Sequence, residues 1–418
     1  MARLLATSLL VFAACAPAGE PTDTVGNGGG KEDRADSRPG DILSTTLKVD
    51  LATRHANAIL EVKPDGDGRL ELDVHGLAIK DVTAPYTLRD GRLLLERLPA
   101  TARVGISYDF GVHDQSDGLL PSGVTLIWPY HCGNVFPCHT DPGDGMVFDL
   151  QLENVPEGQV AIFPDRIETD APSYMLAWAV GNYGHEALGA TSAGTRVNVF
   201  WLPGGKTNAL AGTRHLTEVF DWLERTLGPY AFGHEVGSVS AKWGAGALGG
   251  MEHHPFWHVA DEAMDDEETH AHEAAHGWYG DGVRIRCWED FVLSEGTVSY
   301  LAARALGQVA GEDVEKEVWE DYQQRLEDAG PGIAWPHGCN QVDIIKDGLF
   351  SDLPYMRGAF FYKEVAAAIG AETLDQVLGS FYRDHRGQAA GFFDILVAIE
   401  NETGFDAGPL AMKWLRTR

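Results

Sequence analysis

The chain has 418 residues, of which 44% are hydrophobic and 10% are aromatic. This length and composition provide for two or three ordinary domains with a substantial core, and they exclude a chain that is disordered throughout. The 62 acidic residues outnumber the 32 basic residues and give a formal net charge of −30, so the protein should repel nucleic acid and anionic lipid surfaces.

The first residues read as an export signal. Arg3 supplies a positive charge, and an apolar run follows that is too short to span a bilayer as a mature helix. The run ends in the sequence FAAC at residues 12–15, which resembles a bacterial lipobox, although Phe12 replaces the usual leucine. We therefore predict a lipoprotein signal peptide at 1–15, with ordinary secretory cleavage as the alternative.

A stretch rich in glycine and polar residues follows at 16–41 and is predicted to be a flexible tether. A lipid on Cys15 would anchor the exported protein in the bacterial cell envelope. Ala16 is not the aspartate of an inner-membrane retention signal, so we expect the outer membrane, with the protein facing the periplasm or the exterior.

The remaining cysteines are Cys132, Cys138, Cys287 and Cys339. Export implies an oxidising compartment, where four cysteines can form two disulfides in three possible connectivities. We favour Cys132–Cys138 and Cys287–Cys339. The sequence HCGNVFPCH around the first pair could instead form a metal knuckle, but its spacing is wrong for a zinc finger.

The segment from about residue 42 to residue 200 reads as β structure. RLELDVHGLAI at 69–79 and RLLLERL at 92–98 alternate apolar and polar residues, and PDGDG and RDG supply turns between the runs. No long helical period interrupts this segment. We therefore predict an N-terminal β-domain at 42–200.

From about Leu210 the hydrophobic period becomes helical. Helices are predicted for the segments 216–228, 266–280, 289–307, 312–328, 356–370 and 391–404, most of which end in glycine. The segment 201–418 is therefore predicted to be a mostly helical domain, and the fold class is α+β.

The sequence THAHEAAHGWYGD at 269–281 carries a candidate metal site. His272 and His276 are four positions apart, so on a helix both imidazoles project from one face. Glu273 lies one step round, where it can reach a water on the metal without binding the metal itself. His270 lies about 200° round the helix from His272 and is expected to be structural.

A catalytic zinc ion usually has three protein ligands and one open position. Glu295 lies on the next predicted helix, which can fold back over the metal. Apolar neighbours make a solvated surface position less favourable for this carboxylate. We therefore predict one Zn²⁺ held by His272, His276 and Glu295, with Glu273 as the general base.

The sequence HEAAHGWYGDGVRIRCWEDFVLSEGTVSYL at 272–301 resembles the gluzincin aminopeptidases, which include aminopeptidase N and leukotriene hydrolase. Asp281 and Ser294 replace two asparagines of that pattern. The resemblance implies an N-terminal β-saddle domain followed by a thermolysin-like catalytic domain. It extends from about residue 42 to the C-terminus, where the family's large C-terminal helical domain is expected to be missing and the active site correspondingly open.

Upstream, GALGGMEHH resembles the family's G-x-M-E-N motif, which implies substrate binding by Gly249, Gly250, Met251 and Glu252. The Glu252 carboxylate would bind the free α-amine of a peptide and so place the scissile bond one residue away. His253 replaces the asparagine of this motif.

Downstream, LPYMRGAFFYKEV resembles the family's Tyr-x-Lys-Gly segment and implies that Tyr355 stabilises the oxyanion, with Arg357 in place of lysine. Many relatives also carry a Gln or Glu as a second amine contact, where this chain has Trp128. Glu252 would then be the main contact for the α-amine of the substrate.

The expected function is therefore that of a zinc aminopeptidase that releases N-terminal residues from peptides. The first alternative is the same zinc chemistry without the N-terminal anchor, as in a thermolysin-like endopeptidase or a hydrolase of another small substrate. The second is a non-catalytic surface protein that kept the fold as a binding or zinc-capturing module. His253, His254 and His258 could also hint at a second metal, but packing roles are favoured.

Overall fold

We describe a computed structural model of the chain that covers residues 40–114, 117–128, 130–243, 249–339 and 341–417. The predicted signal peptide, the lipidation site Cys15 and almost all of the predicted tether lie outside the described residues. None of the helices in these ranges combines the length and the apolar character that crossing a membrane requires.

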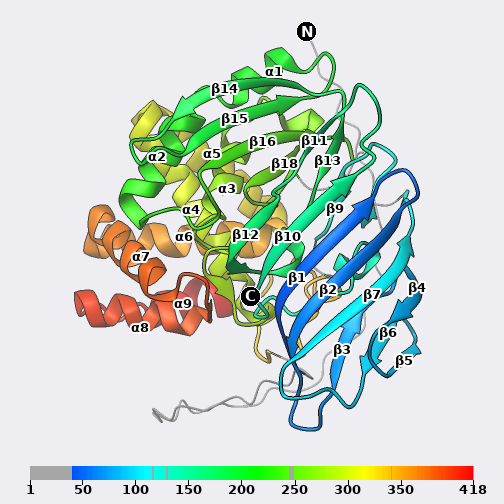
Figure 1. The fold of residues 1–418 in the computed structure, drawn as a ribbon. Coiled ribbons are helices and arrows are strands. Elements are labelled where there is room, and N and C mark those ends of the chain that lie inside the picture. Colours follow the sequence, from blue (N-terminus) through cyan, green and yellow to red (C-terminus); the bar gives the residue numbers. More distant parts are fainter. Residues whose placement is uncertain (1–39, 115–116, 129, 244–248, 340, 418) are drawn as a thin grey trace, which may run out of the picture. The chain divides into compact units, whose positions relative to one another are not determined.

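The first part of the described chain is built from β-strands, as predicted (Figure 1). A six-stranded sheet has the order β12-β10-β1-β2-β7-β4, in which only the β1–β10 pair is parallel. In β2 the buried residues alternate with outward-facing ones, which is why this segment alternates apolar and polar residues. The strands are β1 (Asp41–Asp50), β2 (His55–Lys63), β4 (Leu77–Val82), β7 (Ala102–Phe110), β10 (Met146–Glu153) and β12 (Arg166–Ala171).

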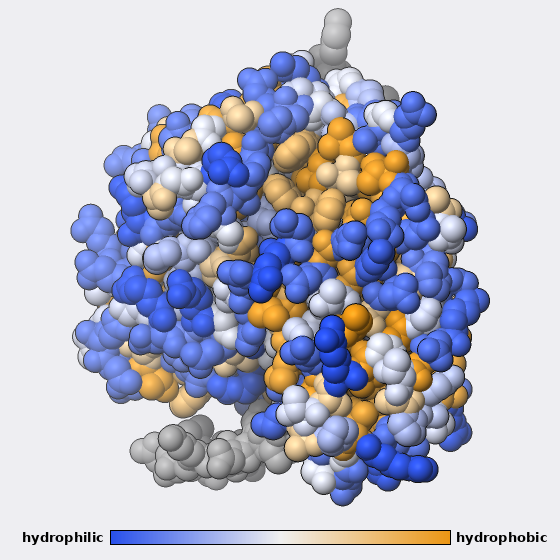
Figure 2. All heavy atoms as spheres, viewed as in Figure 1, coloured by the Kyte–Doolittle hydropathy of each residue, from blue (hydrophilic) through white to orange (hydrophobic). Residues whose placement is uncertain are grey.

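Smaller sheets accompany this one. A three-stranded sheet has the order β3-β6-β5, and two further pairs are β8 with β9 and β11 with β13. These strands are β3 (Leu70–Asp73), β5 (Tyr86–Arg89), β6 (Arg92–Leu95), β8 (Gly118–Leu119), β9 (Thr125–Leu126), β11 (Val160–Ile162) and β13 (Ala179–Gly181). Figure 2 shows hydrophobic side chains gathered on one face near β11 and β13, whereas hydrophilic side chains dominate the face near α7.

A five-stranded sheet of order β14-β15-β16-β18-β17 precedes the helices. Its first two strands lie before residue 202 and pair with each other, and the second of them also pairs with a strand that starts at residue 235. The sheet therefore crosses the predicted domain boundary at residue 200. The strands are β14 (Gly184–Ala190), β15 (Arg196–Trp201), β16 (Glu235–Ala241), β17 (Gly250–Met251) and β18 (Phe256–Ala260), and a separate short pair joins β19 (Arg284–Ile285) to β20 (Ala389–Ala390).

The second part is mostly helical, so the α+β fold class is confirmed. The helices are α1 (Lys206–Gly212), α2 (Leu216–Leu227), α3 (Glu267–Ala275), α4 (Phe291–Ala310), α5 (Glu312–Ala329), α6 (Asp352–Ile369), α7 (Ala371–His385), α8 (Phe392–Thr403) and α9 (Gly408–Ala411). We did not predict α7, although its buried residues Leu374, Val377, Leu378, Phe381 and Tyr382 follow a helical period. Helix α3 is shorter than predicted, because the regular hydrogen bonding stops before His276.

Both favoured disulfides are present. Cys132 bonds to Cys138, and Cys287 bonds to Cys339. The first pair accounts for the cysteines of HCGNVFPCH, so these sulfurs are not metal ligands in a knuckle. The second joins the turn before α4 to the segment between α5 and α6.

Candidate active site

The start of α3 is fixed by its own side chains. Asp266 is the N-cap: its carboxylate accepts a hydrogen bond from the Glu268 backbone N–H at 3.2 Å and from the Thr269 hydroxyl at 2.6 Å. The following turns are buried, and His276 still has right-handed helical dihedrals as the C-cap. His272 and His276 therefore remain on one face, as their spacing predicts.

His270 is directed elsewhere. Its Nδ1 lies 2.9 Å from the Ser238 hydroxyl, and its Nε2 lies 3.1 Å from the Met264 carbonyl oxygen. These contacts join α3 to β16 and to the turn before the helix. The structure thus gives His270 the structural position that we expected.

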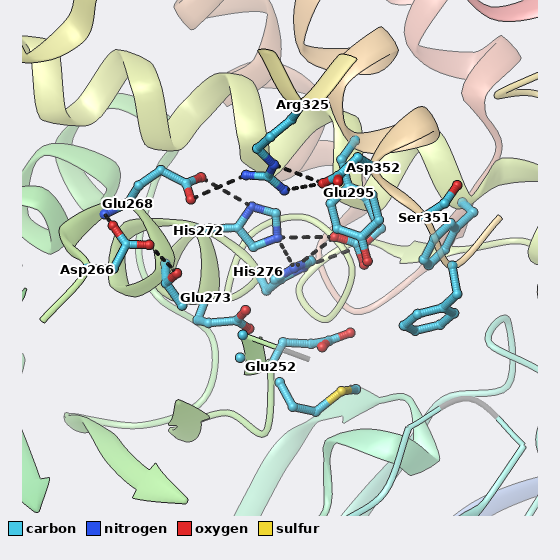
Figure 3. Close-up of a pocket in the computed structure, with 18 of the residues that line it drawn as sticks. Glu252, Asp266, Glu268, His272, Glu273, His276, Glu295, Arg325, Ser351 and Asp352 are labelled. Carbon is cyan, nitrogen blue, oxygen red and sulfur yellow. Dashed lines mark hydrogen bonds and ion pairs between the residues drawn. The ribbon is translucent and has the colours of Figure 1, made fainter. Parts of the chain in front are cut away.

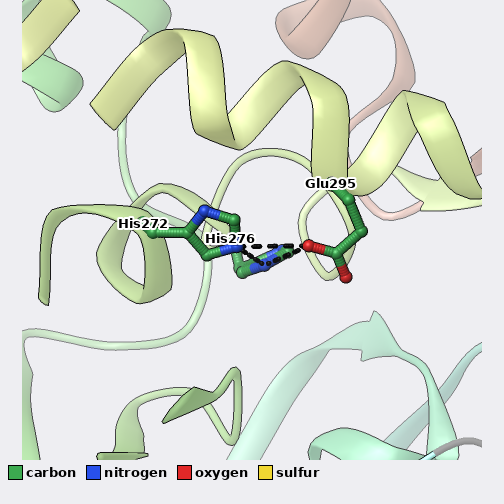
Figure 4. Close-up of side chains that lie close together, drawn as sticks. All are labelled: His272, His276 and Glu295. Atoms are coloured by element: carbon green, nitrogen blue, oxygen red, sulfur yellow. Dashed lines mark hydrogen bonds and ion pairs between the residues drawn. The ribbon is translucent and has the colours of Figure 1, made fainter. Parts of the chain in front are cut away.

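The structure brings the three predicted metal ligands together (Figure 4). The Nε2 atoms of His272 and His276 are 3.3 Å apart, and they lie 3.2 Å and 3.4 Å from the same oxygen of Glu295. In a tetrahedral zinc site with metal–ligand distances near 2.0 Å, ligand atoms are separated by roughly 3.3 Å. The spacing of this triad therefore fits Zn²⁺.

The hydrogen bonds behind the histidines fit a metal as well. Nδ1 of His276 lies 3.0 Å from the Tyr279 carbonyl oxygen and must donate to it, which leaves a lone pair on Nε2. Nδ1 of His272 lies 3.4 Å from the Ser299 hydroxyl and 4.0 Å from a Glu268 oxygen. Lone pairs directed at one another and at a carboxylate repel unless a cation lies between them, so the donor set matches that of a metal centre.

Charge coupling within the triad is strong. Burial would raise the pKa of the Glu295 carboxyl, but the positive charge and hydrogen bonds of the two histidines outweigh this effect and lower the pKa to about 2. Burial would lower the pKa of His276, but the nearby carboxylates of Glu295 and Glu252 raise it well above its usual value. The site is therefore built around a negative centre that favours bound positive charge.

Tyr355 reaches the site because α4 and α6 cross closely. A β-carbon on Gly296 would lie 2.6 Å from the Cα of Gly358, so only glycines allow this approach of the two helices. Gly296 follows Glu295, and Gly358 lies one turn after Tyr355. As a result the Tyr355 ring stacks beside the His272 ring, with centroids 5.8 Å apart, and borders the same cavity.

Glu252 and Glu273 lie close to His276, one of the three predicted metal ligands. One oxygen from each carboxylate and a ring nitrogen of His276 all lie within 4.8 Å of one another. Burial raises the pKa of Glu252 to about 7 and that of Glu273 well above its usual value. Within the described residues, the Oε2 atom of Glu273 has no hydrogen-bond partner although it is buried, as expected of a group whose partner is substrate or water.

The three predicted metal ligands line one cavity of about 800 Å³ together with Glu252, Glu273 and Tyr355 (Figure 3). Gly249, Gly250, Met251 and Glu252 border it along the edge strand β17, which lies outermost in its sheet. Trp288, Phe291 and Phe350 also line the cavity, and they form an aromatic wall that sequence reasoning did not assign to the site. Trp288 and Phe291 are close in the chain, but Phe350 comes from a distant segment, so no local pattern predicted the wall as a whole.

A charged network that we also did not predict supports His272 from behind (Figure 3). Arg325 on α5 binds Asp352 at 2.6 Å and approaches Glu268 to 3.7 Å. Glu268 also accepts a hydrogen bond from the Tyr322 hydroxyl at 2.5 Å. The pairs join α3, α5 and α6, and only the tertiary fold brings them together.

Three positions that depart from the family pattern are buried close to the site, and each can be described by its contacts or its burial. Ser294 Oγ lies 3.4 Å from Nδ1 of His276, where it can support the ligand. Burial raises the pKa of Asp281 well above its usual value, which favours a protonated carboxyl with the shape of an asparagine amide. His253 lies 2.8 Å from the Tyr174 carbonyl oxygen through Nδ1, so it links β17 to the β-domain.

Two further departures lie outside the reacting groups. The Trp128 ring packs edge-on against Phe350, with centroids 4.9 Å apart, and Trp128 is not among the described residues that line the cavity. Arg357 donates hydrogen bonds to the backbone carbonyls of Trp414 and Thr417 near the C-terminus. It therefore fastens the end of the chain to α6.

Comparison with known proteins points to one family. Residues 255–414 match the sequence model of the peptidase family M1 domain. Leucine aminopeptidase 2 of Chaetomium globosum is 23% identical over 63% of this chain and 46% of its own length, and leukotriene A-4 hydrolase of Xenopus laevis is 22% identical over 68% and 51%. The chain thus spans about half the length of these curated relatives.

Solved structures share the fold. The M1 zinc metallopeptidase of Deinococcus radiodurans aligns with a TM-score of 0.76 and is 18% identical in sequence. The alignment covers 90% of this chain and 94% of the Deinococcus chain. Legionella pneumophila aminopeptidase A, in complex with aspartic acid, aligns with a TM-score of 0.79 at 18% identity over 92% of this chain and 50% of its own. Residues 255–414 are thus similar in sequence to the peptidase family M1 domain, and the chain shares its fold with these solved structures.

Proposed function

We propose that the protein is a zinc-dependent aminopeptidase that removes the N-terminal residue of peptides. The observation that carries this proposal is the position of Glu252. Its buried carboxylate lies within 4.8 Å of Glu273 and His276, so an ammonium group bound to it leaves room for one residue before the reacting centre. The names of the matched relatives, several of which are aminopeptidases, support the same activity.

The metal would be held by His272, His276 and Glu295. When bound, Zn²⁺ supplies a Lewis acid for the scissile carbonyl and lowers the pKa of water. Every other step belongs to side chains of this chain.

Glu273 is placed to act as the general base. Its raised pKa suits a carboxylate that takes a proton from the attacking water and then passes it to the leaving amine. The hydroxyl of Tyr355, whose pKa burial raises well above its usual value, stays protonated and donates a hydrogen bond to the oxyanion that develops at the scissile carbonyl. Glu252 meanwhile holds the substrate's ammonium group in register.

A panel of amino acid arylamides tests this proposal. Protein loaded with zinc should hydrolyse at least one arylamide, lose the activity with a chelator and regain it with added zinc. Glu273→Gln should keep the metal, because its side chain is not a ligand, and should lose activity by about 10³-fold or more. Turnover retained by this variant would contradict the role of Glu273.

We also propose that the enzyme works in the bacterial cell envelope, attached through a lipid on Cys15. The support is the N-terminal sequence, in which a short apolar run ends in a lipobox-like FAAC. Mass spectrometry of the protein expressed with its own N-terminus should find a diacylglyceryl cysteine. Cleavage without a lipid would favour ordinary secretion, and Cys15→Ala is the control that cannot carry the modification.

A further inference from the structure

The cavity has an acidic end that the proposed mechanism does not use. Asp266, Glu268, Glu317 and Asp321 line it, and we call these four residues the acidic rim. They come from the start of α3 and from one face of α5, where Glu317 and Asp321 are one turn apart. Arg325, the one arginine among the described lining residues, is paired with Asp352 at 2.6 Å and also approaches Glu268 to 3.7 Å and Asp321 to 4.0 Å. This single guanidinium is shared among three carboxylates, so the four acidic residues of the rim together with Asp352 keep a net negative charge.

The direction of a bound peptide follows from β17 and α3. A β-carbon on Gly249 would lie 3.8 Å from the Thr269 side chain, and one on Gly250 would lie 2.3 Å from Glu273. Glu252, further along the same segment, lies beside His276. The segment 249–252 thus runs from the rim, past the general base, to the group that binds the amine.

A substrate with its ammonium group on Glu252 and its scissile carbonyl near Glu273 must continue in the opposite direction, toward Thr269. The distance along α3 from Glu273 to Thr269 is about 6 Å, which equals roughly two residues of extended peptide. The second and third residues of the peptide therefore lie opposite the rim. Figure 3 shows the same order, with Asp266 and Glu268 on the side of Glu273 that faces away from Ser351.

A second observation shows that a ligand belongs at this junction. Glu273 is only 5% exposed and borders the cavity, and one oxygen of its carboxylate has no hydrogen-bond partner among the described residues. The rim adjoins this group through α3, so the acidic residues continue a site that is built to bind a polar substrate. They are not an isolated surface cluster.

We infer that the acidic rim selects peptides with lysine or arginine at the second or third position and disfavours peptides with acidic residues there. The inference rests on the proposed aminopeptidase function, which sets the direction of the peptide. Its physical basis is charge complementarity at the mouth of a partly enclosed cleft, which raises the local concentration of a cationic substrate and penalises an anionic one.

Three peptides with the same N-terminal residue test the inference: Leu-Lys-Ala, Leu-Ala-Ala and Leu-Glu-Ala, each as a C-terminal amide so that no terminal carboxylate contributes. We expect kcat/KM to fall in that order, with a ratio of at least about tenfold between the lysine and glutamate peptides in dilute salt. The ratio should shrink as salt rises to about 0.5 M, because Asp266, Glu317 and Asp321 of the rim are exposed to solvent.

The variant Glu317→Gln/Asp321→Asn should lower the lysine-to-glutamate ratio by about three- to tenfold. The control Asp313→Asn/Glu320→Gln makes the same two chemical changes on exposed residues of α5 that do not line the cavity, and it should keep the wild-type ratio. Equal rates for the lysine and glutamate peptides, or equal ratios in the two double variants, would overturn the inference while leaving aminopeptidase activity intact.

If none of the peptides is cleaved, binding measurements separate the proposed aminopeptidase function from the proposed selectivity of the acidic rim. That result would contradict the proposed function, and calorimetric titration of the same peptides into zinc-loaded Glu273→Gln protein would then judge the rim alone. Tighter binding of the lysine peptide than of the glutamate peptide supports the rim as a cation-selective surface. Equal affinities overturn it.

Discussion

Gly250 offers a sharp test of how β17 positions the general base. A β-carbon at this position would lie 2.3 Å from Oε1 and 2.5 Å from Cδ of Glu273. Ordinary contacts between such atoms need at least about 3.4 Å, so Gly250→Ala must displace the Glu273 carboxylate by about 1 Å. The strand cannot easily yield instead, because Gly250 pairs with Val259 of β18.

A displacement of about 1 Å in a catalytic group costs roughly 10²-fold in rate, which corresponds to about 2.7 kcal/mol of transition-state stabilisation. We therefore expect kcat of Gly250→Ala on a leucine arylamide to fall by about that factor. Zinc content, measured by atomic emission, should stay at the wild-type level because no ligand moves.

Gly249→Ala is the matched comparison. Its new β-carbon would lie 3.8 Å from Thr269, an ordinary van der Waals distance, so its loss of activity should be far smaller. Neither glycine has a left-handed φ, and backbone strain does not separate the two variants. Wild-type kcat in a zinc-loaded Gly250→Ala protein would refute the contact between β17 and the general base.

Three further predictions concern stability. Gly296→Ala should lower the thermal unfolding midpoint and reduce activity, because its β-carbon would lie 2.6 Å from Gly358 and push α6 away from α4; an unchanged midpoint would show that the helices can separate without cost. Cys287→Ala/Cys339→Ala should destabilise the protein by about 4 kcal/mol in urea titrations, from the entropy of a loop of this sequence separation, and a loss below about 1 kcal/mol would show that the bridge constrains little. Burial lowers the pKa of His258 to about 3, so as the pH drops below about 6.5 the imidazole is protonated in the unfolded chain but not in the folded protein, and the free energy of unfolding falls. The urea midpoint should therefore fall less between pH 7 and pH 5 in His258→Gln than in the wild type. An equal fall in the two proteins would argue against a neutral buried imidazole.

The sequence predicts the metal triad in part because helical spacing is a local property. The separation of His272 and His276 places both imidazoles on one face of any helix, and the structure retains this arrangement even though α3 ends before His276. Glu295 required the assumption that the next helix folds back. Glu252 and Tyr355 were assigned from family resemblance alone, since nothing in their local sequence marks them as part of the site.

Other features of the site depend on contacts between distant segments. The crossing of α4 and α6 rests on two glycines that lie in separate helices, and each alone reads as an ordinary small residue. The pairing of Arg325 with Asp352 and the aromatic wall at Trp288, Phe291 and Phe350 likewise arise only when the helices pack. Hydrophobic period and spacing describe one element at a time and cannot place two elements against each other.

The central claim is that Glu252 anchors the free amine of a peptide beside a zinc centre. The most direct measurement compares kcat/KM for a leucine-initiated peptide with that for its N-acetylated form, in the zinc-loaded wild-type protein and in Glu252→Ala. We predict that the wild type prefers the free amine by at least about 10²-fold and that Glu252→Ala loses most of this preference through slower cleavage of the free peptide. Equal cleavage of the two peptides by the wild type would contradict the account and would instead indicate an endopeptidase.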